Sequence, residues 1–189
     1  VAINGFGRIG RCVTRIIANR DDIELVAIND LASFEMIEYL LKYDTVHGLF
    51  NKDIEILEDA YIRIGDSKVK ILSDRDPSKL NFADYGADVI LECTGVFLTT
   101  EKAQIHLDNG AKKVLFSAPA KDDTPTYVIG VNADDYNGEK IISNASCTTN
   151  CLGPIAKIID DNLEIQKGLM TTIHSYTNDQ SILDVKHAK

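Results

Sequence analysis

A cysteine and a histidine toward the end of the sequence have the residue types and the setting for covalent chemistry. Cys147 follows the predicted strand Ile141–Ile142 and a run of small polar residues, and it opens a helical pattern of apolar positions. A thiol in the first turn of a helix lies at the positive end of the helix dipole, which stabilises the nucleophilic thiolate. His174 follows the predicted strand Leu169–Ile173. Its imidazole can take the thiol proton or, when charged, stabilise the thiolate and protonate an oxyanion.

Cys147 and Cys151 leave two other interpretations open. Spaced four residues apart, they lie on one helix face and could bind a metal ion. Zinc needs two further ligands at a recognisable spacing, and His174 and His187 are isolated in the sequence, so we predict no metal site. A disulfide between helical neighbours lies near the geometric limit, so we expect both thiols to be free at rest. Cys151 is then interpreted as a core residue.

A glycine loop near the start of the chain predicts a dinucleotide site. Gly5, Gly7 and Gly10 form the pattern G-x-G-x-x-G between a short strand and a helix. The first glycine permits a tight turn, the second lets the backbone approach a pyrophosphate, and the third lets helix and strand pack closely. The free N–H groups of the helix N-terminus favour the phosphates.

The residue at the end of the next strand selects the cofactor. Asp30 stands there, where an acid accepts hydrogen bonds from both adenine-ribose hydroxyls and repels a 2′-phosphate. The following Leu31 is apolar and offers nothing to a 2′-phosphate. We therefore predict NAD. The alternative is a simple glycine turn with a helix-capping aspartate.

Apolar spacing predicts strands and helices in alternation, which is typical of a parallel sheet with right-handed crossovers. The expected strands are 1–3, 23–28, 89–91, 114–116 and 127–129. Three helices are expected. The first presents Ile9, Cys12, Val13, Ile16 and Ile17 on one face. The second covers 34–41 after the N-cap Ser33, and the third covers 100–107 before Asn109-Gly110. Residues 54–56, 61–64 and 69–71 alternate in polarity and predict a small antiparallel insertion.

The fold class is therefore α/β: a Rossmann-type doubly wound parallel sheet with a small antiparallel insertion, followed by the start of an α+β catalytic domain. No linker rich in glycine, serine or proline separates two parts. We place the NAD-binding Rossmann domain at 1–146 and the beginning of the catalytic domain at 147–189. Pro154 conflicts with an uninterrupted helix after Cys147, and it predicts either a kink or a regular helix that starts near Gly153.

The composition argues against several classes of function. Hydrophobic residues make up 44% and charged residues 26% of the chain, as in ordinary globular domains. The net charge of −9 and the absence of long lysine or arginine runs argue against a nucleic-acid partner. No apolar stretch approaches the roughly 20 residues that span a bilayer, so we expect no membrane partner. Four scattered cysteines indicate a reducing, cytoplasmic location.

Several segments together resemble phosphorylating glyceraldehyde-3-phosphate dehydrogenase, and the resemblance covers the whole chain. The segment Ser143–Leu152 around Cys147 is the most specific of them. The others are Ile3–Arg11, Tyr43–Gly48, Cys93–Phe97, Ser117–Pro119 and Leu169–His174, and the run Ser117–Asn132 looks like a bacterial member.

The resemblance implies the reaction and its partners. Cys147 is similar to the nucleophile that attacks D-glyceraldehyde 3-phosphate, and His174 to the residue that activates it. Hydride passes to NAD, and inorganic phosphate then releases 1,3-bisphosphoglycerate from a cysteine thioester in this step of glycolysis. The family also implies a homotetramer for the full-length protein.

The resemblance also assigns residues to binding roles. Ser146 and Thr148 match positions that bind the incoming phosphate, and Thr177 matches one that binds the phosphate of the substrate; the alternative for all three is helix capping or turn formation. The positions that match cofactor contacts are Gly5, Gly7, Arg8, Ile9, Gly10, Asp30, Arg75 and Ser117.

Two other functions stay open on the sequence. Erythrose-4-phosphate dehydrogenase shares the cysteine segment, although Asp30 and Tyr176-Thr177 favour the triose. The sequence begins at Val1 inside an apolar strand and stops at Lys189, whereas chains of the family are considerably longer. We therefore expect an N-terminal fragment that is inactive on its own, and a non-catalytic NAD-binding module is the alternative for the fragment itself.

Overall fold

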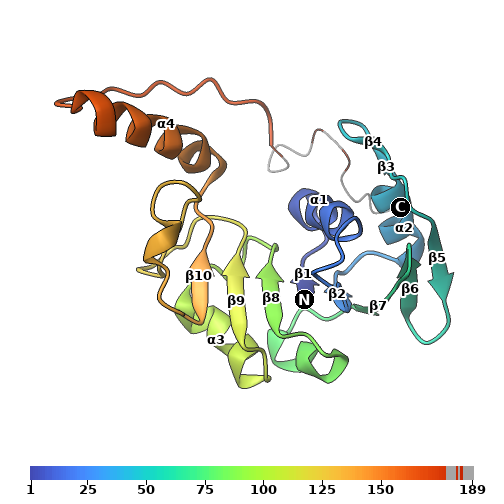
Figure 1. Ribbon diagram of the computed structural model, residues 1–189. Coiled ribbons are helices and arrows are strands. Elements are labelled where there is room, and N and C mark those ends of the chain that lie inside the picture. Colours follow the sequence, from blue (N-terminus) through green and yellow to red (C-terminus); the bar gives the residue numbers. More distant parts are fainter. Residues whose placement is uncertain (178–181, 183, 185–189) are drawn as a thin grey trace.

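The computed structural model describes residues 1–177, 182 and 184 of the chain. Eight strands form one sheet in the order β10-β9-β8-β1-β2-β7-β6-β5, as Figure 1 shows. All neighbours from β10 to β7 run parallel, and β6 and β5 continue the sheet antiparallel. The parallel strands are β1 (Ala2–Asn4), β2 (Ala27–Asn29), β7 (Ser67–Leu72), β8 (Val89–Glu92), β9 (Lys113–Phe116) and β10 (Ile141–Ser143).

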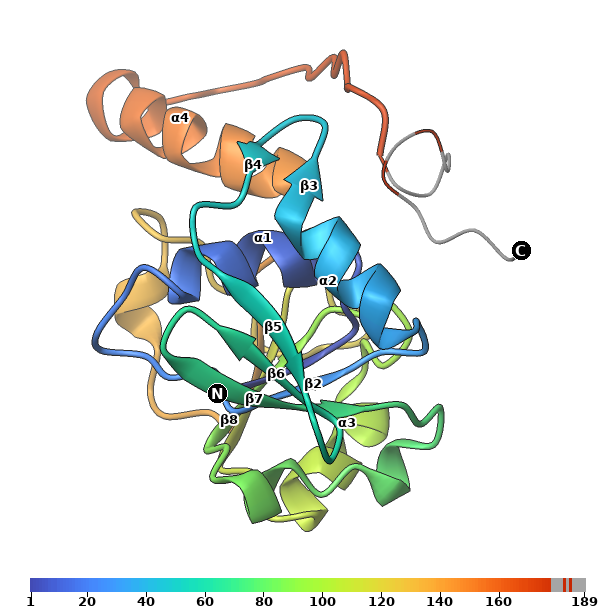
Figure 2. The same ribbon diagram turned by 90° about the vertical axis from the view of Figure 1, so that its right-hand side faces the viewer.

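The chain winds outward from β1 in one direction and then in the other, so the sheet is doubly wound. Helices α1 (Arg8–Ile17) and α2 (Phe34–Lys42) cover one face, and α3 (Thr100–Asp108) covers the opposite face, as Figure 2 shows. The order reverses between β1 and β8, which lie side by side. In such sheets a ligand binds at this reversal, beyond the carboxyl ends of the strands. The predicted fold class is confirmed.

Alternate residues of the central strands pack into two separate hydrophobic cores, one on each face of the sheet. Ala2 and Ala27 face the α3 side, together with Ile90 and Val114. Ile3 and Ile28 face the α1 and α2 side. In β1 and β2, the small side chains on one face and the β-branched ones on the other follow the period of two of a strand. Because both faces are buried, these strands read as continuous apolar runs.

The antiparallel insertion is continuous with the main sheet. β7 pairs parallel with β2 on one side and antiparallel with β6 (Tyr61–Ile64) on the other, and β5 (Ile54–Leu57) forms the edge. Residues 69–71, expected in the antiparallel insertion, thus belong both to the insertion and to the parallel sheet. A two-stranded hairpin of β3 (Tyr43–Asp44) and β4 (Gly48–Leu49) follows α2.

Local capping signals fix the helix ends. The Ser33 side chain accepts a hydrogen bond from the Met36 N–H at the start of α2, and Thr99 does the same for Lys102 at the start of α3. Each such cap is worth about 1 kcal/mol. Gly110, with φ of 94°, follows the end of α3 in a conformation that favours glycine. Three short 3₁₀ helices at Pro77–Lys79, Phe82–Tyr85 and Ala133–Asp135 complete the elements.

The expected inner face of α1 is partly wrong. Ile9 and Ile16 are about half exposed, whereas Arg11 and Thr14 are buried. A Cβ on Gly10 would lie 2.2 Å from the carbonyl oxygen of Gly5, so the helix meets the preceding loop through its smallest residue. This close approach sets the rotation of α1 and turns Thr14, rather than Ile16, toward the sheet.

Two expected strands are also wrong. Residues 127–129 form no regular strand; the segment touches β10 only through an isolated parallel bridge between Thr126 and Ser143. Residues 169–173 are extended but pair with no strand among the described residues, and Leu169 and Ile173 are fully exposed. The second expected strand, 23–28, becomes regular only at Ala27.

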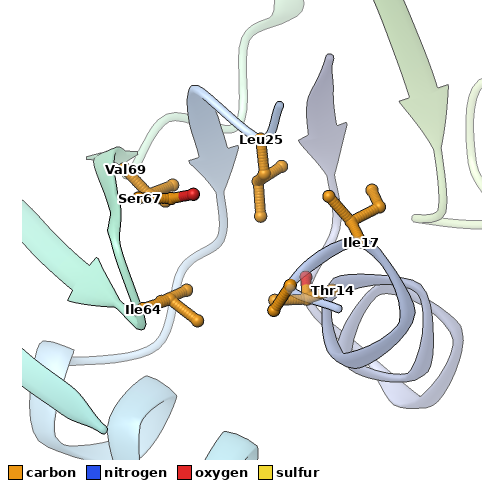
Figure 3. Close-up of a pocket in the computed structure, with 7 residues that line it drawn as sticks. Thr14, Ile17, Leu25, Ile64, Ser67 and Val69 are labelled. Carbon is orange, nitrogen blue, oxygen red and sulfur yellow. The ribbon is translucent and has the colours of Figure 1, made fainter. Parts of the chain in front are cut away.

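A small cavity lies between α1 and the sheet, as Figure 3 shows. Its volume is about 10 Å³, and its lining is Thr14, Ile17, Ala18, Leu25, Ile64, Ser67 and Val69. Thr14 is fully buried, and its hydroxyl oxygen has no hydrogen-bond partner within the described part of the chain. A buried hydroxyl in this state lowers stability.

We expect Thr14→Val to raise the free energy of unfolding by about 1 kcal/mol, because it replaces the unpartnered hydroxyl with a methyl group of the same shape. Urea denaturation measures the change. Thr14→Ser is the matched control, and it should destabilise by about 1 kcal/mol because it keeps the hydroxyl and loses a methyl group. A destabilised Thr14→Val variant would show that the hydroxyl is bonded in solution.

Candidate active site

Strand β10 leads the chain through a tight reversal into the helix that carries Cys147. The Ser143 hydroxyl donates to the Ala118 carbonyl at 2.8 Å and accepts the Ala145 N–H at 3.1 Å. Ala145 then adopts a left-handed conformation, with φ of 59°. Ser146 caps α4 (Cys147–Leu163) by accepting the Thr149 N–H. The thiol therefore lies in the first turn of a helix, where the helix dipole favours a thiolate.

His174 returns to this turn from the far end of α4. The segment that follows α4 runs back beside the helix in Figures 1 and 2. It brings the His174 Nε2 atom to 3.2 Å from the Cys147 Sγ atom. The other ring nitrogen, Nδ1, lies 2.6 Å from the Ser175 carbonyl oxygen. A carbonyl can only accept, so Nδ1 carries a proton and Nε2 is the atom that exchanges one with the thiol.

The two groups shift each other's pKa in the direction that favours an ion pair. The hydrogen bond from His174 is the main cause that lowers the pKa of the Cys147 thiol, and the backbone N–H of Thr148 adds to it. The Ser175 carbonyl is the main cause that raises the pKa of His174, followed by the contact with Cys147. Thiolate and imidazolium therefore coexist over a wider pH range than two isolated groups would allow.

Helix α4 departs from two expectations. It is one helix from Cys147 through Pro154, so its regular part does not start near Gly153, which was one of the two alternatives. Cys151, expected in the core, is exposed, and so are Ile155, Ile158 and Ile159. All four cysteines are free thiols. The spacing on α4 correctly indicated a helix, but the face that it defines is not buried within the described residues.

The glycine loop has the close contacts that a dinucleotide cradle requires. Gly5 has φ of 95°, and a Cβ there would lie 2.7 Å from the Thr94 nitrogen. Gly10 contacts the Gly5 carbonyl, whereas a Cβ on Gly7 would meet nothing within 4 Å. Gly7 caps α1 with no side chain of its own. The first N–H groups of α1 therefore face an open approach, to which Arg8 and Ile9 contribute their backbone.

Asp30 joins this loop to the end of β2. Its Oδ2 atom accepts the Phe6 N–H at 2.8 Å, and its Oδ1 atom accepts the Ala32 N–H at 2.8 Å. Asp30 is buried, with 6% of its surface exposed. Its carboxylate therefore fixes the backbone of the glycine loop relative to the segment that follows β2.

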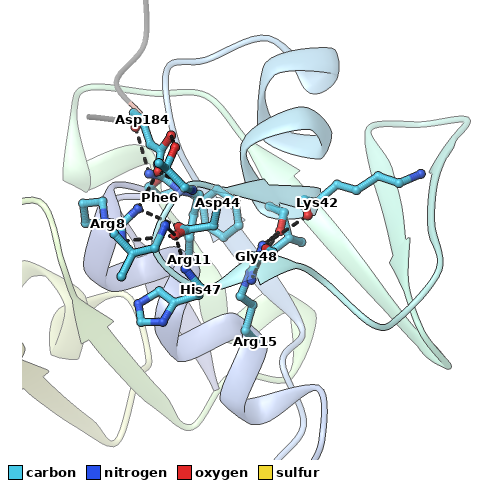
Figure 4. A network of polar contacts seen from close by, with 12 residues as sticks. Phe6, Arg8, Arg11, Arg15, Lys42, Asp44, His47, Gly48 and Asp184 are labelled. Carbon is cyan, nitrogen blue, oxygen red and sulfur yellow. Dashed lines mark hydrogen bonds and ion pairs between the residues drawn. The ribbon is translucent and has the colours of Figure 1, made fainter. Parts of the chain in front are cut away.

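A polar network ties the start of α1 to the β3–β4 hairpin, as Figure 4 shows. The Arg8 guanidinium donates to the Asp44 carboxylate at 2.6 Å and to the Asp184 carboxylate at 2.9 Å. Burial alone would raise the pKa of Asp44. Hydrogen bonds from the His47 and Val46 N–H groups and from Arg8 outweigh it and lower the pKa overall.

The other predicted residues lie in four separate parts of the chain. Ser117 follows β9 and donates its hydroxyl and its N–H to the Glu92 carbonyl. Arg75, in the loop after β7, and Thr177, after α4, are exposed. The Ser146 hydroxyl lies 3.0 Å from that of Thr148, beside Cys147. The capping role considered for Ser146 is thus present.

Sequence reasoning missed a buried polar chain beneath the cradle. Glu92, fully buried at the end of β8, accepts from the Asn4 side chain at 2.7 Å, and Asn4 in turn accepts from Asn29 at 2.8 Å. His106 of α3 lies 3.6 Å from Glu92. The polar residue that ends each of three adjacent strands, at positions 4, 29 and 92, is the signal that could have found it.

Comparison with protein families now adds an independent finding. Residues 1–100 match the family described as "Glyceraldehyde 3-phosphate dehydrogenase, NAD binding domain", and residues 146–189 match "Glyceraldehyde 3-phosphate dehydrogenase, C-terminal domain".

The chain belongs to the glyceraldehyde-3-phosphate dehydrogenase family.

Curated glyceraldehyde-3-phosphate dehydrogenases agree with this assignment. The chain is 50% identical to that of Salmonella typhimurium over 184 residues, which are 97% of this chain and 55% of the relative. It is 52% identical to that of Clostridium pasteurianum over 190 residues, which are 100% of this chain and 57% of the relative. The chain thus spans a little over half the length of these relatives.

The family assignment confirms the predicted resemblance and the predicted cofactor, because the matched domain is described as NAD-binding. Within the described residues, no helix is long and apolar enough to cross a membrane.

We expect Cys147 to react with iodoacetamide faster at neutral pH than Cys12, Cys93 or Cys151, because the hydrogen bond from His174 lowers the pKa of Cys147. Burial raises the pKa of Cys93 to about 11 and makes it the slowest. His174→Asn should move the midpoint of the Cys147 pH–rate profile upward and slow alkylation several-fold at pH 7. Mass mapping of the labelled thiols gives both results. An unchanged profile in His174→Asn would contradict the pairing.

Proposed function

We propose that this chain supplies the cofactor cradle and the reactive pair of an NAD-dependent phosphorylating glyceraldehyde-3-phosphate dehydrogenase. The reaction is the oxidation of D-glyceraldehyde 3-phosphate with inorganic phosphate to 1,3-bisphosphoglycerate through a cysteine thioester. The 3.2 Å contact between Cys147 and His174, at the start of the helix that follows the dinucleotide fold, is the observation that carries it.

The residues present fit NAD. A Cβ at Gly5 or Gly10 would clash with backbone, so only glycine lets the loop turn this tightly, while Gly7 leaves the N-terminus of α1 open. In the proposed complex, the backbone of Arg8 and Ile9 holds the pyrophosphate, Asp30 accepts the adenine-ribose hydroxyls, and Arg75 and Ser117 make further contacts. NAD, when bound, supplies the acceptor for the substrate hydride.

The reactive pair carries the covalent steps. The Cys147 thiolate forms a bond to the aldehyde carbon, and the carbonyl oxygen takes a proton from the His174 imidazolium to give a hemithioacetal. His174 takes that proton back as the hydride leaves the carbon, which produces the thioester. Inorganic phosphate then attacks the thioester carbon, and Cys147 leaves as the thiolate that the helix N-terminus and His174 stabilise.

Hydroxyl groups beside Cys147 suit phosphate. The Ser146 and Thr148 hydroxyl oxygens lie 3.0 Å apart, and each hydroxyl can donate one hydrogen bond to a phosphate oxygen. We assign these two residues to the incoming phosphate and Thr177 to the phosphate of the substrate. We expect a cytoplasmic homotetramer, with glyceraldehyde 3-phosphate and inorganic phosphate as the other partners.

NADH formation by the natural-length protein tests the proposed reaction. Turnover should require inorganic phosphate and should be faster with glyceraldehyde 3-phosphate than with erythrose 4-phosphate. Cys147→Ser should abolish it, and His174→Asn should lower kcat by about 100- to 10,000-fold, the usual contribution of a positioned acid–base group. Faster turnover with the tetrose would assign the chain to the erythrose-4-phosphate enzyme instead.

We expect Asp30→Ala to weaken NAD binding and to shift the ratio of NADP to NAD affinity toward NADP, since the mutation removes the charge that repels a 2′-phosphate. Calorimetric titration with both cofactors measures the ratio. Asp30 also accepts hydrogen bonds from the Phe6 and Ala32 N–H groups, so its loss also loosens the loop and weakens the binding of both cofactors. That effect leaves the ratio unchanged, and an unchanged ratio would refute the selective role.

A further inference from the structure

The side chain of Asn150 makes a pair of contacts that the proposed reaction does not use. Asn150 lies one turn after Cys147 on α4, and its Nδ2 atom donates to two backbone carbonyls. The distances are 2.7 Å to the Asn144 oxygen and 3.0 Å to the Ser146 oxygen. A side-chain amide has two N–H donors, so both bonds can form at once.

The two carbonyls stand on either side of a strained residue. Ala145 lies between them in the left-handed conformation and is buried, with 5% of its surface exposed. This conformation is unfavourable for a residue other than glycine, because the Cβ atom comes too close to the following carbonyl oxygen. The reversal from β10 into α4 therefore needs bonds that hold it, and Asn150 spans it from one side to the other.

Burial contributes little to the helical side of this reversal. The β10 side is held to the sheet, because the Asn144 N–H donates to the Phe116 carbonyl and the Ser143 hydroxyl bonds both Ala118 and Ala145. On the other side, α4 has no buried residue in the described part of the chain. The direction of the first turn of α4 thus depends on its end bonds, and Asn150 supplies two of them.

We propose that Asn150 is a positioning residue for the nucleophile. Its amide clamps the Asn144 and Ser146 carbonyls across the left-handed Ala145 and so fixes the first turn of α4, which directs the Cys147 thiol toward the Nε2 atom of His174. This inference depends on the proposed function, because it assigns Asn150 to the pair formed by Cys147 and His174.

A matched pair of asparagines on one helix gives a direct test. Asn162 also donates its side-chain amide to a carbonyl four residues earlier, that of Ile158 at 2.7 Å, but it lies at the far end of α4. Asn150→Ala and Asn162→Ala therefore remove the same kind of side chain and the same kind of helical bond. Only Asn150→Ala also releases the Asn144 carbonyl.

The measurement is the rate of Cys147 alkylation by iodoacetamide as a function of pH, with circular dichroism and thermal unfolding as controls for folding. We expect Asn150→Ala to move the midpoint of the profile upward, toward an ordinary thiol, and to slow alkylation several-fold at pH 7. We expect Asn162→Ala to keep the wild-type profile. Profiles that coincide for Asn150→Ala and the wild type would overturn the proposal, and so would an equal shift in Asn162→Ala.

Two further variants keep the outcomes distinct. Should Asn150→Ala fail to fold, Asn150→Ser carries the same test, because a serine hydroxyl bonds the carbonyl four residues earlier but does not reach Asn144. If His174→Asn shifts the pH profile and Asn150→Ala does not, the positioning role of Asn150 is refuted, whereas the pairing of Cys147 with His174 stands. A wild-type profile that already matches an ordinary thiol would instead refute the proposed function.

Discussion

The contact between the Cys147 thiol and the His174 imidazole is the constraint that shapes the last part of the chain. Helix α4 carries the backbone away from the thiol over 17 residues, or about 25 Å at 1.5 Å per residue. Residues 164–174 span at most about 36 Å when fully extended, so they must be largely extended to return. Glu164, in a left-handed conformation at the end of α4, reverses the direction. Residues 169–173, which the sequence predicts as a strand, are therefore part of the extended segment that brings His174 back to Cys147.

The position of the thiol depends in turn on the sheet. Alternation of small and β-branched residues in β1 and β2 gives each face a core of its own, and these cores hold helices on both sides. β10 lies at the edge of this sheet and pairs with β9, which places Ser143 opposite Phe116. Backbone bonds at this point fix where the chain leaves the sheet. The capping and clamping groups of Ser146 and Asn150 then set the direction in which α4 begins.

Sequence patterning predicted the features that depend on neighbours along the chain. The glycine loop, the capped start of α2, the end of α3 before Asn109-Gly110, the central parallel strands and the helical start at Cys147 all follow from short-range spacing. The errors lie where packing and backbone conformation, rather than residue spacing, decide the outcome. The close approach of Gly10 to Gly5 turns Thr14 inward and Ile16 outward. The spacing of Cys151 and Ile155 predicts a helix face, but it cannot say what covers that face. The pair of bonds from Asn150 depends on the left-handed conformation of Ala145, which the type of this residue does not predict.

The buried polar chain at the carboxyl edge of the sheet joins the strand ends from which the cradle loops leave. Glu92 carries a carboxylate into the interior, and such a group is tolerated only when its oxygens are bonded. Asn4 and the Thr94 N–H supply those bonds, and Asn29 extends them by exchanging two 3.0 Å bonds with the backbone of Asp74. The ends of β8, β1 and β2 are thereby joined to the segment after β7. Because removal of one member would leave its partners buried and unbonded, the set acts as a unit. The loops that follow these strands, including the glycine loop and Asp30, are therefore held in register by side chains rather than by apolar packing alone.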